Sequence, residues 1–208
     1  MFLLNLAWFE TLAWVTGFLV ALTLHEAAHA LAANFLGDPT AKFAGRISLN
    51  PLRHLDPLGT LFLFFVGVGW GKPVPVNALN FFQQRQGSIL TALAGPLANL
   101  VVALVLALPY NFLSQSGSLF GDFLGIVIFV NILLLVFNLL PVPPLDGGGV
   151  VANLLPWRYR VLYEQYGPIL LFGILAVGLV FDWNILWRIL EPATNLIWLV
   201  VNQTTGFY

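Results

Sequence analysis

Long apolar runs with almost no charge are the feature that most constrains what this chain can fold into. A helix needs about 20 apolar residues to cross a hydrocarbon core, and only helices or closed barrels leave no backbone group unpaired there. The runs lack period-two alternation, which favours helices. The chain is 59% hydrophobic and 8% charged, against roughly half and a quarter in soluble domains. We therefore expect an all-α polytopic membrane protein embedded in a lipid bilayer.

Four to five of these runs are long enough to cross the membrane. Residues 58–69 form an apolar run too short for a full crossing, which predicts a re-entrant segment. The polar stretch 40–57 and the piece 71–76 are expected to be loops and short membrane-associated strands. We expect one integral membrane domain over residues 1–208, with a core at 11–155 and C-terminal helices within 160–203. The predicted spans are 11–36, 88–108, 123–140, 163–181 and, interrupted by Glu191 and Pro192, 185–201.

The placement of basic residues predicts the orientation, because short cytoplasmic loops collect Lys and Arg. If the segment 58–69 turns back, only Arg188 of the eight basic residues falls on the opposite side. If this segment crossed the membrane instead, Lys72 and Arg85 would move to the other side, and the basic residues would no longer favour one side. We therefore expect a multi-pass protein of the cell membrane with its basic side in the cytoplasm. The residues on that side are Lys42, Arg46, Arg53, Lys72, Arg85, Arg158 and Arg160.

Composition also limits the partners and metals. The net charge of −1 offers no basic surface for nucleic acid, whose binding depends on neutralising phosphates. With no Cys in the chain, a transition metal has to be held by imidazole and carboxylate groups. The N-terminus lacks the basic region of a secretory signal, so we expect the first helix to act as the insertion signal.

The string HEAAH, from His25 to His29, lies inside the first apolar run. Residues four apart share one face of a helix, so His25 and His29 can offer two nitrogens to one ion while Glu26 lies beside it. Ionisable groups are costly in the middle of a membrane helix, at about 2.5–3.5 kcal/mol for an acid. Ordinary polar contacts are therefore the weaker interpretation. A hydrolytic zinc site takes three protein ligands and one water, so a third ligand has to come from elsewhere.

Asp146 is the best candidate for the third ligand. It follows an apolar span and opens the glycine-rich turn Leu145-Asp146-Gly147-Gly148, where glycine allows close backbone approach. The alternative is that Asp146 serves only as a helix N-cap, a position that Asp fills well. The other acids lie at span ends or on later segments.

Together these residues resemble the site-2 protease family of intramembrane zinc metalloproteases. The resemblance spans His25 to Gly148. The sequence shows no PDZ-like or cystathionine-synthase-like domain, so it resembles the minimal subgroup of the family. It is carried by HEAAH, AGRISLNPLRHLDPLGT, GKPVPVN, AGPLAN and NLLPVPPLDGG.

The resemblance implies that His25, His29 and Asp146 bind one Zn²⁺ ion and that Glu26 is the catalytic base. It also implies that Asn138 steadies the substrate or the oxyanion, although a hydrogen bond between helices explains an Asn there equally well. His54 matches a histidine near the family's active site, whereas the position alone favours a solvated loop residue. Asn99 is expected to pack or form hydrogen bonds between helices.

The predicted function is hydrolysis of peptide bonds in or near transmembrane segments of membrane-protein substrates, near the cytoplasmic face. The substrate must unwind locally, and residues 72–76 can pair with it by strand addition. Two alternatives remain at this stage. A zinc transporter would also place His and Glu on membrane helices, and an inactive relative would bind membrane proteins without cleaving them.

Overall fold

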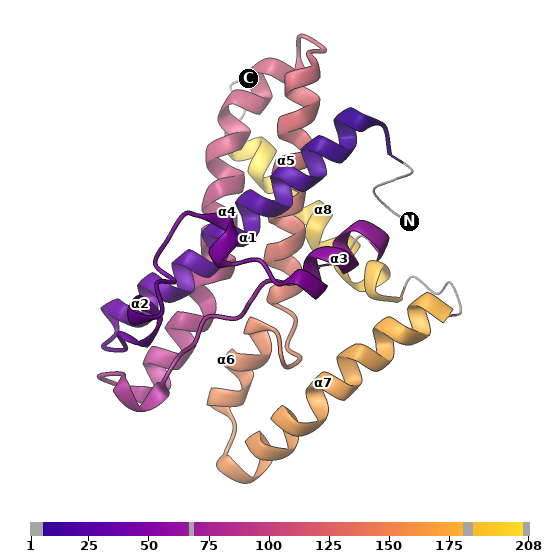
Figure 1. The fold of residues 1–208 in the computed structure, drawn as a ribbon. Helices are drawn as coiled ribbons and strands as arrows, with labels where there is room; N and C mark the ends of the chain where they lie inside the picture. The colour runs from indigo at the N-terminus through magenta and orange to yellow at the C-terminus, as the bar shows by residue number, and fades with distance from the viewer. Residues whose placement is uncertain (1–5, 67–68, 181–184, 206–208) are drawn as a thin grey trace.

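The computed structural model describes residues 6–66, 69–180 and 185–205, which form helices joined by loops and turns (Figure 1). The expected short strands are absent from these residues. Instead, Leu55 and Gly71 form an isolated antiparallel bridge, and Pro73 and Pro75 cannot donate the backbone hydrogen bonds that would extend it. The elements are α1 (Trp8–Phe35), α2 (Thr40–Phe43), η2 (Pro51–Arg53), α3 (Pro57–Val66), η3 (Ala78–Asn80), α4 (Gln84–Ser114), α5 (Leu119–Asn138), α6 (Asp146–Leu154), α7 (Trp157–Val180) and α8 (Ile185–Thr205).

Four described helices are long and apolar enough to cross a membrane, which confirms the predicted all-α membrane architecture. They are α1, α4, α5 and α7. The helix α8 does not join them; it carries Arg188 and Glu191. Pro192 was expected to interrupt this segment, but the helix continues through it.

The helices α1, α4 and α5 pack against one another and form the centre of the molecule. Small residues allow the close approach: a Cβ added at Gly17 of α1 would lie 3.2 Å from the Cα of Val127 on α5. Ala103 and Ala107 of α4 are fully buried in the apolar cluster that α4 and α5 share with α8. The helix α7 contacts α6 and α8 and stands apart from the central three (Figure 1).

The connection from α1 to α4 folds back on itself beside α1. After Leu55 the chain forms α3, and at Gly71 it is again beside Leu55, with which Gly71 forms the isolated bridge. The next residue, Lys72, donates its backbone N–H to the His54 carbonyl over 2.7 Å. The segment therefore returns to the place where it left, as a re-entrant segment has to do. Its depth in the bilayer stays a prediction.

A candidate metal centre

The three predicted ligands lie together although α1 and α6 are far apart in sequence. His25 Nε2 and His29 Nε2 are 3.0 Å apart. The Oδ2 atom of Asp146, the first residue of α6, lies 3.1 Å from the former and 3.3 Å from the latter. Both histidines are buried. The helical spacing of HEAAH brings the two imidazoles together, and the packing of α6 against α4 brings in the carboxylate.

The second nitrogen of each imidazole fixes its tautomer. The amide nitrogen of Asn99 donates to the Ala21 carbonyl over 3.0 Å and to Asn131 Oδ1 over 3.1 Å. The amide oxygen of Asn99 therefore accepts from His25 Nδ1 over 2.6 Å. His29 Nδ1 donates to the carbonyl of Thr91 over 2.7 Å. Both Nδ1 atoms carry the proton, so the two Nε2 atoms present lone pairs to Asp146.

His25 Nε2, His29 Nε2 and Asp146 Oδ2 therefore face one another with lone pairs, and no hydrogen atom lies between them. Asp146 Oδ2 is buried and lacks a hydrogen-bond partner. A proton on one Nε2 would satisfy one contact, whereas a cation satisfies all three. Zinc bonds of about 2.0–2.1 Å at tetrahedral angles separate ligand atoms by about 3.3 Å, close to the distances found here. The donor set therefore fits one zinc ion.

Gly95 of α4 leaves the space that such an ion requires. A Cβ at this position would lie 2.4 Å from His29 Nε2 and 2.6 Å from His25 Nε2. In the sequence, Gly95 stands out only as part of a Gly-Pro pair inside a predicted span. The fold shows that this glycine faces the two imidazoles.

The glycines after Asp146 allow the expected close backbone approach, and the backbone that they approach is the preceding turn. A Cβ at Gly147 would lie 2.3 Å from the Leu139 carbonyl oxygen, and one at Gly148 would lie 2.4 Å from Pro143 N. These glycines therefore fit α6 against the turn that precedes it. Their contribution is to allow the tight turn that brings Asp146 to α1.

Glu26 directly follows His25 on α1 and is buried. Its Oε2 lies 3.8 Å from Nη2 of Arg46, which is also buried and lies between α2 and η2. The sequence indicated Arg46 only as one of several cytoplasmic charges. Its position against Glu26 depends on the folded connection.

Asn138 and His54 each had two interpretations from the sequence. Asn138 is half-buried in the last turn of α5, and its amide donates to the Leu134 carbonyl of the same helix over 3.0 Å. Its catalytic role stays a prediction. His54 is fully buried and pairs through Nε2 with the Ser48 carbonyl over 2.7 Å, so the solvated-loop interpretation is wrong. Burial holds the pKa of His54 below its ordinary value, against the opposing effect of that hydrogen bond.

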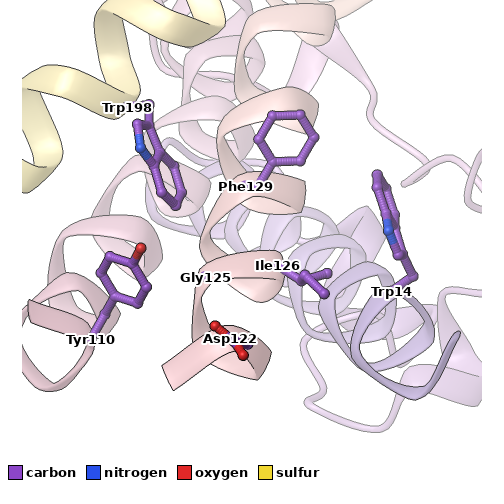
Figure 2. Close-up of a pocket in the computed structure, with 7 residues that line it drawn as sticks. All are labelled: Trp14, Tyr110, Asp122, Gly125, Ile126, Phe129 and Trp198. Atoms are coloured by element: carbon purple, nitrogen blue, oxygen red, sulfur yellow. The ribbon is translucent and has the colours of Figure 1, made fainter. Parts of the chain in front are cut away.

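A cavity of about 330 Å³ lies elsewhere, among α1, α4, α5 and α8 (Figure 2). Its wall includes none of the candidate ligands. Trp14 precedes His25 by eleven positions on α1, which is about 16 Å at 1.5 Å per residue. The cavity is therefore separate from the candidate metal centre. It is lined by Trp14, Tyr110, Asp122, Gly125, Ile126, Phe129 and Trp198.

The fold and the site define a multi-pass membrane protein with a His–His–Asp group that could hold one metal ion. The profile of peptidase family M50 matches residues 111–181. The chain is 38% identical over 190 residues to "Putative zinc metalloprotease YwhC" of Bacillus subtilis (strain 168), covering 86% of each chain. It is 33% identical over 178 residues to "Putative zinc metalloprotease Rip2" of Mycolicibacterium smegmatis (strain ATCC 700084 / mc(2)155), covering 81% of this chain and 68% of that protein.

A further Rip2, from Mycobacterium tuberculosis (strain ATCC 25618 / H37Rv), is 30% identical over 177 residues. No solved structure matches the chain at comparable significance. The chain belongs to peptidase family M50, the site-2 protease family, as its motifs predicted. It is a membrane metalloprotease by family.

Proposed function

We propose that this protein is an intramembrane zinc endopeptidase that cleaves membrane proteins in or near their transmembrane segments. The observation that carries the proposal is the meeting of His25 Nε2, His29 Nε2 and Asp146 Oδ2 beside Glu26 in a bundle of apolar helices. His25, His29 and Asp146 are the proposed zinc ligands. Bound zinc supplies a Lewis acid that polarises the peptide carbonyl and lowers the pKa of water.

The protein groups move the protons. The Glu26 carboxylate accepts a proton from the attacking water and then delivers it to the leaving amine. Asn138 donates a hydrogen bond to the carbonyl oxygen as negative charge develops there. The amide has two N–H groups, and only one of them donates to the Leu134 carbonyl. Asn99 and the Thr91 carbonyl keep the two imidazoles in the tautomer that leaves Nε2 bare.

The substrate pairs with the extended segment 71–76. Val74 and Val76 make no backbone hydrogen bond within the described residues, so their N–H and C=O groups are available to an unwound peptide. Strand addition gives such a peptide main-chain hydrogen bonds without requiring a particular sequence. This docking exposes a scissile carbonyl that a helical substrate keeps in its own hydrogen bonds.

The active site opens toward the cytoplasmic side of the cell membrane. The connection from α1 to α4 carries Lys42, Arg46, Arg53 and Lys72. Arg85 at the start of α4 donates to the carbonyl of Leu154 at the end of α6 over 3.5 Å. These basic residues therefore lie at the end of the bundle that holds the ligands, and short cytoplasmic loops are rich in such residues.

The test compares the wild-type protein with Glu26→Gln in the membranes of the same cells. We expect both to bind zinc, because Glu26 is not a ligand, and only the wild type to release fragments of membrane proteins. Quantitative proteomics of the two membranes identifies the substrates. Equal proteolysis by purified wild-type and Glu26→Gln proteins in detergent would refute the mechanism. Zinc flux into liposomes at equal rates for both proteins would instead support transport.

A further inference from the structure

Arg46 joins the proposed catalytic base to the proposed substrate-binding segment. Its side chain is only 6% exposed, and Nη2 lies 3.8 Å from Glu26 Oε2. The same guanidinium donates from Nη1 to the Pro73 carbonyl over 3.3 Å and from Nη2 to the Lys72 carbonyl. Burying a charge is costly unless charged and hydrogen-bonding partners surround it. Arg46 has both kinds of partner, on two different elements.

The extended segment is held at both of its ends by other residues. At the start, the Lys72 N–H donates to the His54 carbonyl over 2.7 Å. At the end, the Asn77 N–H donates to Asp38 Oδ2 over 2.7 Å. Neither of these contacts involves Glu26. Among the described ion pairs and hydrogen bonds, the guanidinium of Arg46 alone links this segment directly to Glu26.

We propose that Arg46 is a positioning residue that sets the register of the peptide substrate relative to Glu26. The inference rests on the function proposed above. A substrate paired with Val74 and Val76 takes its position from this segment, so the distance from its scissile carbonyl to the base depends on where Arg46 holds Lys72 and Pro73. Strand pairing repeats every two residues, so a loosened segment permits register shifts of two residues without reversing the faces of the substrate.

The chemistry of the contact requires arginine. A planar guanidinium can donate from two nitrogens to adjacent carbonyls while its charge faces a carboxylate, whereas a lysine ammonium is a single compact charge. Arg53 provides a matched comparison in the same connection. Its side chain is exposed, and Nη1 donates over 2.7 Å to the Gly45 carbonyl. None of the described hydrogen bonds or ion pairs joins Arg53 to Glu26 or to Lys72.

The experiment uses the full chain in detergent micelles with leucine-rich single-span peptides that contain one glycine-proline unwinding site. Wild type, Arg46→Gln, Arg46→Lys and Arg53→Gln are compared at equal amounts of folded, zinc-loaded protein. Mass spectrometry gives the bond that is cleaved, and initial rates give kcat and KM. A misplacement of about 1 Å lowers catalysis by about 100-fold.

We expect Arg46→Gln to lose about 100-fold in kcat/KM and to cleave bonds two residues away from the wild-type bond, with normal zinc content. Arg46→Lys should show the same shift with a smaller loss, and Arg53→Gln should behave as wild type. Unchanged bond choice in Arg46→Gln, or in Arg46→Lys if the glutamine variant does not fold, would overturn the proposal even if the rate falls. Absence of cleavage by the wild type would instead count against the proposed function itself.

Discussion

Asn99 and Asn131 form a chain of amides in the centre of the apolar bundle. Both are fully buried, and the chain runs from His25 through Asn99 to Asn131, whose amide donates to the Val127 carbonyl over 2.9 Å. A buried polar group without a partner costs about 1–3 kcal/mol. These contacts therefore hold His25 in one orientation and also join α1, α4 and α5.

We expect Asn99→Ala to weaken zinc binding by about 10–100-fold, the range found when a hydrogen bond that orients a metal ligand is removed. The substitution leaves the Nδ1 proton of His25 without its acceptor. Asn131→Ala should have a smaller effect, because Asn131 acts only through Asn99. Competition with a chromogenic chelator measures both affinities. A larger loss in Asn131→Ala than in Asn99→Ala would contradict this order.

Gly95→Ala should abolish zinc binding while the helices remain folded. The added methyl group would lie 2.4 Å from His29 Nε2 and fill the space between the imidazoles. Gly173→Ala on α7 is the matched control, since a Cβ there meets no atom within 4 Å. Zinc content by atomic absorption and helix content by circular dichroism distinguish the two. Full zinc occupancy in Gly95→Ala would show that the ion lies elsewhere.

At the scale of elements, Asp38 forms hydrogen bonds with both ends of the connection between α1 and α4, at Thr40 near its start and at Asn77 and Asn80 near its end. Its carboxylate accepts from the backbone and hydroxyl of Thr40, from Asn77 N–H and from the amide of Asn80. Burial raises the pKa of this carboxyl, but the hydrogen bonds lower it further, so the pKa lies below its ordinary value. The charged form therefore stabilises the folded connection.

The depressed pKa of Asp38 gives the direction of the pH effect. The stabilisation is present above the unfolded pKa, near pH 4, and is lost as the pH falls through the lower folded pKa. We expect the protection of backbone amides in residues 71–80 against hydrogen exchange, corrected for the slower intrinsic exchange in acid, to fall as the pH drops. Asp38→Asn should show faster exchange already at neutral pH, because its amide would face an N–H donor. Exchange rates unaffected by this substitution would argue against the role of Asp38.

At the scale of the whole molecule, the proposed zinc ligands come from α1 and α6, and Gly95 of α4 lies against them. An ion that binds only the folded state stabilises it by about 4 kcal/mol when its concentration is 1,000 times Kd. Removal of zinc with 1,10-phenanthroline should therefore lower Tm, and added zinc should restore it. In Asp146→Ala the Tm should no longer respond to either treatment. A zinc-dependent Tm in that variant would exclude Asp146 as a ligand.

The sequence by itself determined the membrane class and most of the helices. Apolar runs can be hydrogen-bonded in lipid only as helices or barrels, so 11–36 predicts α1 and 123–140 predicts α5 within a few residues. The spacing in HEAAH placed His25 and His29 on one face because a helix repeats every 3.6 residues. These are local properties, and they do not depend on distant parts of the chain.

Only the tertiary structure decided which distant groups meet. The spacing in sequence does not fix the contact of Gly95 with the imidazoles or that of Arg46 with Glu26. The same holds for His54, which was expected in solvent but is buried, with its backbone paired to the returning chain at Lys72 and its ring to the Ser48 carbonyl. Local sequence fixes backbone conformation through short-range hydrogen bonds, whereas these contacts depend on how α1, α4 and the connection between them pack.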